Sequence, residues 1–198
     1  MSRHRAEGPA RRRSEPQPIN TRYVVLVFAL AFAVLVLDQV TKVLATRLLS
    51  QDDPVPLIGD IITLQLVFNP GAAFSFASGM TWIFTIIALV VVVVVVRIAR
   101  TIGSGWWAVM LGLLLGGAAG NLMDRLFRDP GFGRGHVVDF INYSGFFIGN
   151  LADIAIVGAA VGIAVLAVLG LETDGSRANA PRPVAAAEEA ESPGEHDG

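Results

Sequence analysis

Four long apolar runs constrain the fold of this chain more than any other feature of its sequence. A bilayer core about 30 Å thick takes roughly 20 apolar residues per helix, and each run approaches that length. The second run contains seven consecutive valines, which still favours helix, because hydrocarbon leaves no partner for an unpaired backbone group. The sequence therefore predicts an all-α integral membrane protein with four transmembrane helices, over about residues 23–42, 80–97, 106–123 and 147–171.

The first run could instead be a cleaved signal peptide, since basic residues precede it. Sequence compatible with a helix continues past the run through Lys42, so we expect a retained span. Arginines are dense before the first span, and Arg97 and Arg100 follow the second. The positive-inside rule then places the N-terminus, the second connection and the C-terminus in the cytoplasm.

The two ends of the chain lack hydrophobic periodicity and are rich in Pro, Ala, Arg, Glu and Gly. Residues 1–21 are interpreted as a disordered basic cytoplasmic tail, and residues 172–198 as a disordered acidic one. Residues 22–171 between them form the membrane domain. Lys42 is the only lysine among 15 basic residues, which we interpret as a bias of composition.

The outward connections carry β-like patterns. In residues 61–68, Thr63 and Gln65 alternate with apolar residues, which is typical of a half-buried strand, and a turn follows at Asn69. A second short β-like run follows Gly135. The chain has no cysteine and three histidines, two of them in the tails, so the sequence predicts no disulfide, metal site or cofactor.

Polar residues cluster at the end of the third span and the start of the fourth. Asn121, Asp124 and Arg125 share one helix face by their spacing, although Arg125 could simply extend towards the lipid headgroups beside an interfacial ion pair. Asn150 and Asp153 repeat this spacing, and each could serve only the helix N-terminus, as a cap and a favourable charge. An acid inside an apolar segment is costly, which favours a functional role.

Other polar residues are predicted at the same outer level of the membrane. Asp139 could be an exposed loop acid, and Asn69 could cap its own turn or point into a shared site. Asp38 and Lys42 are four residues apart and are interpreted as a structural helical ion pair. Gly112, Gly116 and Gly120 recur every four residues, which indicates close helix packing. The convergence of these polar residues at one level of the membrane indicates a functional site.

Two carboxylates brought close together cannot both ionise cheaply, so one keeps its proton where the other has lost it. The ionised carboxylate can take a proton from water as the water attacks an amide, while the protonated one binds the carbonyl oxygen. A glycosidase could use the same pair of carboxylates. Whether the pair suits that reaction depends on the separation of the two carboxylates.

Five motifs follow one another in the chain: "DQVTK", "NPGAAFS", "GAAGNLMDR", "HVVDFI" and "NLADIAI". In this order and spacing they resemble the bacterial lipoprotein signal peptidases, or type II signal peptidases, over roughly residues 22–170. The resemblance implies four transmembrane helices with a small extracytoplasmic β element and a short outer-face helix. It also implies an aspartyl endopeptidase that cleaves diacylglyceryl-modified prolipoproteins before the lipidated cysteine.

The resemblance assigns roles by motif. Asp139 and Asp153 match the catalytic dyad, and Asn69, Asn121, Arg125 and Asn150 match residues that bind substrate or support the dyad. Asp38, Lys42 and Asp124 match structural positions. The expected partners are the signal peptide and lipobox of a prolipoprotein and membrane phospholipid, without nucleic acid. The expected protein is a monomer in the bacterial cytoplasmic membrane, with its active site on the extracytoplasmic side.

Three other classes of protein remain open at this stage. An ion- or proton-coupled transporter subunit would place its acids near mid-bilayer, often in broken helices. A non-catalytic anchor held by the glycine face would leave the polar outward loops unexplained. A presenilin-type aspartyl protease would require a GxGD motif, and the sequence has only "GFGRG" in the relevant connection.

Overall fold

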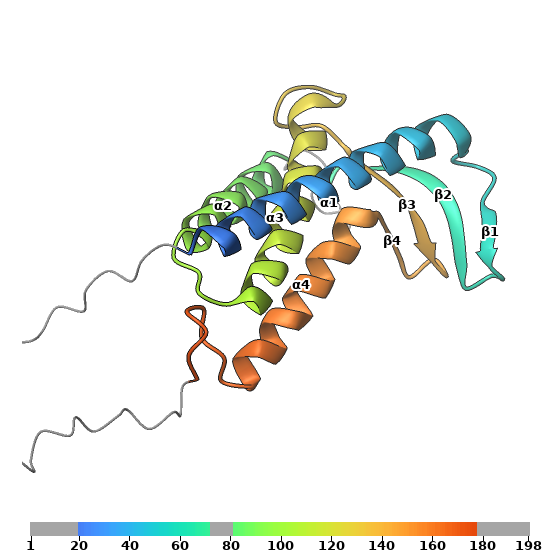
Figure 1. The fold of residues 1–198 in the computed structure, drawn as a ribbon. Coiled ribbons are helices and arrows are strands. Elements are labelled where there is room, and N and C mark those ends of the chain that lie inside the picture. The colour runs from blue at the N-terminus through green and yellow to red at the C-terminus, as the bar shows by residue number, and fades with distance from the viewer. Residues whose placement is uncertain (1–19, 72–80, 178–198) are drawn as a thin grey trace, which may run out of the picture.

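The computed structural model describes residues 20–71 and 81–177 of the chain. These residues form four long helices and four short strands. Two strands lie between the first and second helices and two between the third and fourth, and together they form a single sheet at one end of the helices (Figure 1). The elements in chain order are α1 (Thr21–Leu48), β1 (Val55–Ile58), β2 (Ile62–Asn69), α2 (Thr81–Ala99), α3 (Gly105–Phe127), β3 (Val137–Tyr143), β4 (Phe147–Gly149) and α4 (Leu151–Val168).

Helix α3 is the centre of the bundle and packs against α1, α2 and α4 (Figure 1). Its glycines allow this close packing: a Cβ added to Gly116 would lie 2.6 Å from Val34 Cβ, and one added to Gly117 would lie 2.6 Å from the Ala152 carbonyl oxygen. The predicted role of the glycine spacing in helix packing is therefore confirmed for α1 and α3. The apolar core of the bundle consists of Val27, Ala31, Val95, Ala99, Ile102, Ala108, Leu111 and Leu115.

The sheet is antiparallel throughout, with its strands in the order β1-β2-β3-β4. It packs on the last turns of α1 through a second apolar cluster that includes Ala45, Leu66 and Val138. The pairing of β2 with β3 shifts register between Leu64 and Val67, and the two strands then continue to Asn69 beside Val137. The sheet thus extends from the end of α1 to the start of α4.

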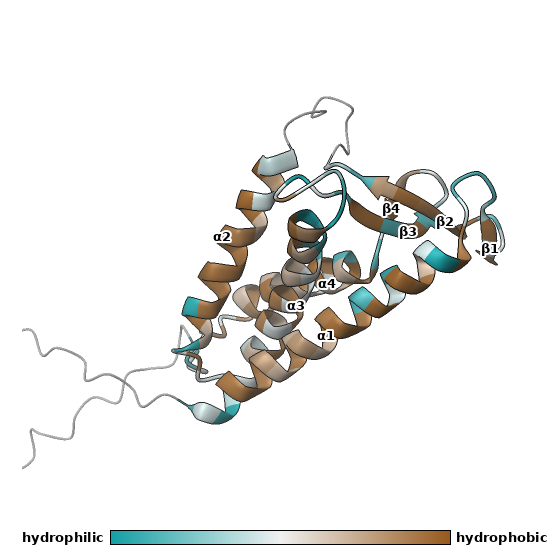
Figure 2. Ribbon diagram, turned by 90° about the horizontal axis from the view of Figure 1, so that it is seen from above, coloured by the Kyte–Doolittle hydropathy of each residue, from teal (hydrophilic) through white to brown (hydrophobic). Residues whose placement is uncertain are grey.

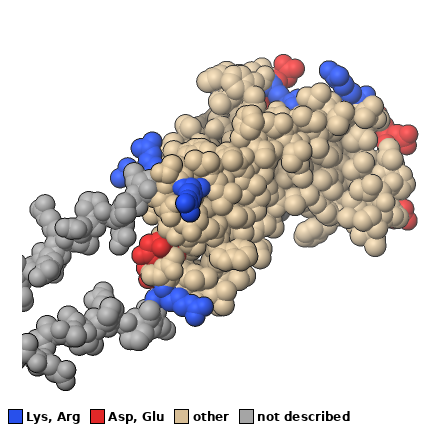
Figure 3. Space-filling view, in the orientation of Figure 1, with Lys and Arg blue, Asp and Glu red and all other residues tan. Residues whose placement is uncertain are grey.

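The helices expose apolar side chains along their length, and each is long and apolar enough to cross a membrane. Figure 2 shows this as mostly hydrophobic helices, and Figure 3 shows charged side chains gathered at the two ends of the molecule with an uncharged belt between them. Charged residues at both ends of an apolar belt match the two surfaces of a bilayer. The predicted fold class, a four-span membrane protein with a small sheet, is confirmed.

Several predicted boundaries differ from the structure. Residues 147–149 form strand β4 and not helix, because the chain reverses at Ser144 and Gly145 and pairs back on β3. Asp139 lies in β3 and not in a loop. Residues 172–177, assigned to the disordered tail, form a turn in which Leu171 pairs with Arg177. Within 20–71 and 81–177 the four long helices are the only helices, so the short outer-face helix expected from the resemblance is not found there.

Candidate active site

The predicted polar residues meet where the sheet joins the bundle. Asp139 lies within β3 and is only 2% exposed. The alternative interpretation of Asp139 as an exposed loop acid is therefore wrong. Asn69 ends the neighbouring strand β2, and its side-chain amide donates a hydrogen bond of 2.8 Å to Asp139 Oδ2. The Asn69 Oδ1 atom also accepts the Gly71 backbone N–H at 2.8 Å. One asparagine therefore caps its turn and holds the acid at the same time.

Asn150 joins the two acids of the site. It is the N-cap of α4, where its Oδ1 atom accepts the Asp153 backbone N–H at 3.1 Å while Asp153 Oδ2 accepts the Asn150 backbone N–H at 3.0 Å. This reciprocal pair is a capping box, which explains why the helix begins here. The Asn150 amide nitrogen then donates to Asp139 Oδ1 at 2.6 Å. A single residue thus contacts both carboxylates.

Asn121 holds the second carboxylate from the central helix α3. Its amide nitrogen donates to Asp153 Oδ1 at 2.9 Å. Its Oδ1 atom accepts from the Asn150 side chain at 3.2 Å and from Lys42 Nζ at 2.9 Å. Each carboxylate therefore accepts two hydrogen bonds from residues that are themselves fixed by other bonds, which keeps the arrangement rigid.

The environment of Asp139 favours a bound proton. The pKa of its carboxyl is raised from 3.8 to about 6, chiefly by burial and in part by the charge of Asp153. The hydrogen bonds from Asn69 and Asn150 and the charge of Lys42 lower the pKa, but by less than burial raises it. An acid of this kind exchanges its proton near neutral pH, as a general acid or base must.

Arg125 supplies positive charge to the site. Arg125 is 9% exposed, so its side chain is enclosed by the protein and does not extend outwards from the bundle. Its guanidinium lies 5.7 Å from the ring centre of Phe84 on α2. The charge interacts with Asp139, Asp153 and Asp124. Its Nε and Nη1 atoms are buried with no hydrogen-bond partner among residues 20–71 and 81–177.

Asp38, Lys42 and Asp124 are almost completely buried, and the two aspartates contact the backbone next to each acid of the site. Lys42 Nζ is 2.8 Å from Asp38 Oδ2 and 2.9 Å from Asp124 Oδ2. Sequence reasoning missed two residues that complete this network: Gln39, whose amide contacts both aspartates, and Arg128, which pairs with Asp124 at 2.7 Å. The four-residue spacing of Asp124 and Arg128 was a usable signal for the second pair.

A groove opens beside Asp153. It has a volume of about 640 Å³ and lies between strand β4 and the exposed face of α4. Its walls are almost entirely apolar apart from Asn150 and Asp153. The lining residues are Tyr143, Phe146, Phe147, Gly149, Asn150, Asp153, Ile154, Val157 and Gly158. One acid of the pair is therefore reachable from an apolar surface.

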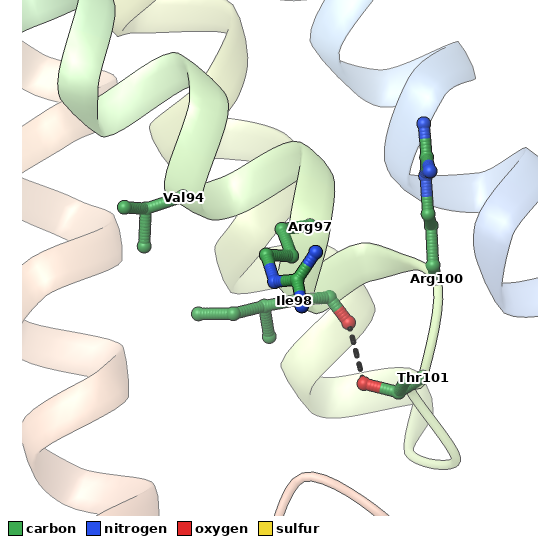
Figure 4. Close-up of a pocket in the computed structure, with 5 residues that line it drawn as sticks. All are labelled: Val94, Arg97, Ile98, Arg100 and Thr101. Carbon is green, nitrogen blue, oxygen red and sulfur yellow. Dashed lines mark hydrogen bonds between the residues drawn. The ribbon is translucent and has the colours of Figure 1, made fainter.

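A second pocket, of about 420 Å³, lies at the far end of α2 (Figure 4). It is lined by Val94, Arg97, Ile98, Arg100 and Thr101, and the Thr101 hydroxyl donates to the Ile98 carbonyl at 3.1 Å. No carboxylate lines it. Among the residues described, this pocket therefore offers no carboxylate for general acid–base chemistry.

The fold and the site define a multi-pass membrane protein with two linked carboxylates at one end of its helices, next to an apolar groove. A model of the family described as signal peptidase (SPase) II matches residues 30–169. The chain belongs to the signal peptidase II family, and it is therefore a peptidase.

Relatives agree with this assignment. The chain is 52% identical over 162 residues to the lipoprotein signal peptidase of Rhodococcus jostii (strain RHA1), covering 82% of each chain. It is 50% identical over 159 residues to that of Mycobacterium avium (strain 104), covering 80% of this chain and 87% of the relative. A solved structure titled as a bacterial membrane enzyme, at 1.9 Å resolution, matches with a TM-score of 0.64 at 26% identity, covering 78% of this chain and 97% of the other.

Proposed function

We propose that the chain is an aspartyl endopeptidase that removes the signal peptide of diacylglyceryl-modified prolipoproteins by cleaving before the lipidated cysteine. The observation that carries this proposal is the linkage of Asp139 and Asp153 through Asn150 at the edge of an apolar groove. The names of the relatives support the substrate class. We propose no cofactor, because the chemistry needs only the two acids and water.

The two acids act as a pair that shares one proton. The ionised carboxylate takes a proton from a water molecule as its oxygen attacks the scissile carbonyl carbon, while the protonated carboxyl donates to the carbonyl oxygen. The tetrahedral intermediate then collapses. The carboxyl that took the proton of water passes it to the leaving amide nitrogen, and the C–N bond breaks. The proton given to the carbonyl oxygen returns to the other carboxylate, so the pair again holds one proton. Asn69, Asn121 and Asn150 hold the carboxylates in place during these transfers.

Arg125 assists the same reaction. Two of its N–H groups are buried without a partner in the described part of the chain, and its charge interacts with both acids. Donors preorganised in a water-poor site stabilise charge that develops in the transition state. We infer that Arg125 binds the substrate backbone near the scissile bond and limits the repulsion between the two carboxylates.

The groove suits a substrate that stays in the membrane. A diacylglyceryl chain and an apolar signal peptide need an apolar surface open to lipid, which the exposed face of α4 offers. Strand β4 is the edge of the sheet and borders the groove, so it can pair with the cleavage segment in an extended conformation. The peptide bond would then lie beside Asp153.

The charges suggest the orientation. The end of α2 lies opposite to the sheet, together with the start of α1 and the end of α4 (Figure 1). Arg97 is in the last turn of α2, and Arg100 follows the helix directly. The positive-inside rule assigns this end to the cytoplasm. We propose both termini there, the dyad at the extracytoplasmic surface of the bacterial cytoplasmic membrane, and a monomeric enzyme. Asp153 is the third residue of α4, so it lies at the end of this helix and not at its middle, where a transporter would place its acid.

Asp139→Asn and Asp153→Asn test the dyad. Each variant is expressed in cells that lack the native activity, and a lipid-modified prolipoprotein is followed by gel electrophoresis. We expect both to insert into the membrane and neither to process the substrate. Asp53→Asn, a change of an exposed loop acid, is the matched control and should process normally. Maturation by either dyad variant at the rate of this control would refute the assignment.

A further inference from the structure

Lys42 lies at the centre of a network that the proposed reaction does not use directly. It is the only lysine in the chain, and its side chain is fully buried on α1. An ammonium group has three protons to donate, and Lys42 has three acceptors: Asp38 Oδ2 at 2.8 Å, Asp124 Oδ2 at 2.9 Å and Asn121 Oδ1 at 2.9 Å. We call these four residues the Lys42 cluster.

Each aspartate of the Lys42 cluster extends to one dyad-bearing segment. Asp38 Oδ1 accepts the backbone N–H of Ala152 at 3.1 Å, and Ala152 precedes Asp153 in the first turn of α4. Asp124 Oδ2 accepts the backbone N–H of Val138 at 3.2 Å, and Val138 precedes Asp139 in β3. The ammonium therefore joins the backbones on which the two acids are carried.

The third acceptor fixes the orientation of an amide. The oxygen of the Asn121 side chain faces Lys42, so its nitrogen must face Asp153, to which it donates at 2.9 Å. A flipped amide would present its oxygen to a carboxylate and its N–H groups to an ammonium, and both contacts would be repulsive. Lys42 thus selects the amide orientation that gives Asp153 its donor.

We propose that Lys42 is a positioning residue that sets the relative placement of Asp139 and Asp153. This inference rests on the proposed dyad. Arginine occupies every other basic position outside the histidines, but a planar guanidinium does not match three converging acceptors on α1 and α3 as a compact ammonium does. Gly120 leaves room for the cluster, since a Cβ there would collide with the Asp38 carboxylate.

Kinetics of purified variants test this proposal. Lys42→Met alone leaves the buried Asp38 without its cation, whereas Asp124 keeps Arg128. The main variant is therefore Asp38→Asn/Lys42→Met, which removes one charge of each sign. We expect the double variant to keep its folded yield, with KM within about twofold of the parent and kcat lower by about 10- to 100-fold, because small misplacements of reacting groups are costly. A double variant that is folded and retains kcat within about twofold would overturn the proposal.

Arg128→Gln is the matched control. It removes the other ion pair of Asp124, at 2.7 Å, but leaves the contacts of Lys42 and the Val138 bond in place. Its kcat should stay within about twofold of the parent. An equal loss of kcat in this control would show that any weakening around Asp124 suffices, and Lys42 would then have no special role.

A second measurement does not depend on how these variants fold. Because the chain has one lysine, ¹⁵N-lysine labelling gives one ammonium signal, which is compared between the parent and Asp153→Asn. We expect the signal to shift, since Asn121 connects the two groups; an unchanged signal would contradict the connection. Activity retained by Asp139→Asn or Asp153→Asn refutes the dyad itself, whereas inactive dyad variants with normal kcat in the double variant refute only the positioning role.

Discussion

Replacing Asp139 by Asn should make folding less sensitive to pH. The pKa of Asp139 is raised from 3.8 to about 6 in the folded protein, and its side chain is 2% exposed, so solvent screening is small. A shift of roughly two units corresponds to about 3 kcal/mol, at about 1.4 kcal/mol per unit. This free energy is the cost of ionising the buried acid.

The sign follows from proton binding. Between about pH 4 and pH 6 the folded protein keeps the Asp139 proton while the unfolded chain has lost it, so the free energy of unfolding falls as pH rises through this window. Below the window the cost is absent, and above about pH 6 it is present in full. Asp153 and Lys42 face Asp139 with opposite charges, and both are unchanged in the variant.

Asparagine cannot ionise, so the variant avoids this fall in the free energy of unfolding as the pH rises. It also turns one acceptor into a donor that faces an amide N–H of Asn69 or Asn150, which costs about 1 kcal/mol or somewhat more. We expect Asp139→Asn to be less stable than the parent at pH 4 and about 1–2 kcal/mol more stable at pH 7.5, although it is inactive. Active sites commonly hold groups in such costly states.

Thermal unfolding in detergent, followed by the fluorescence of the three tryptophans, measures this change between pH 4 and pH 8. The Tm of Asp139→Asn relative to the parent should rise across the window, while the Tm of the exposed control Asp53→Asn should stay parallel to the parent. Parallel curves for Asp139→Asn and the parent would refute the reasoning, because burial would then impose no cost on the ionised acid.

Two further predictions concern α3. Arg125→Ala should lower kcat/KM by about 100-fold, as the loss of one preorganised donor commonly does, with normal membrane abundance by immunoblot; activity that falls only in proportion to abundance would contradict a direct role. Gly120→Ala should destabilise the protein by about 1–3 kcal/mol through overpacking against Asp38. In thermal unfolding, Gly158→Ala on α4 should be neutral or slightly stabilising, since nothing lies within 4 Å of its added Cβ; equal effects at the two glycines would argue against close packing as the cause.

The helices could be predicted from the sequence because their signal is local. An apolar run of sufficient length specifies a membrane span without reference to the rest of the chain, and each of the helices α1 to α4 covers most of one predicted run. The alternation around Thr63 and Gln65 likewise predicted β2. Prediction was wrong at residues 147–149, which are apolar like the span that follows but pair with β3. Periodicity does not distinguish a short apolar strand from the start of a helix.

The candidate site was predicted as a convergence of residues and not as a geometry. The residues of the site come from five elements, and the partners of its main hydrogen bonds are far apart in the chain: Asn69 and Asp139 are separated by 70 positions, and Lys42 and Asn121 by 79. Spacing on one helix relates only residues three or four apart. The alternatives for Asn69 and Asn150, cap or site residue, are not exclusive, since each side chain makes both contacts.

The sequence by itself determined the membrane class, the number of spans, the glycine face of α3 and the set of polar residues at one level, because length, composition and helical spacing are properties of short segments. Only the tertiary structure decided that Asp139 is buried and that Asn150 links it to Asp153. It also decided that the one lysine joins, through two aspartates, the segments that carry these two acids. These features depend on how α1, α3, β3 and α4 pack together, and packing is set by all of these segments at once.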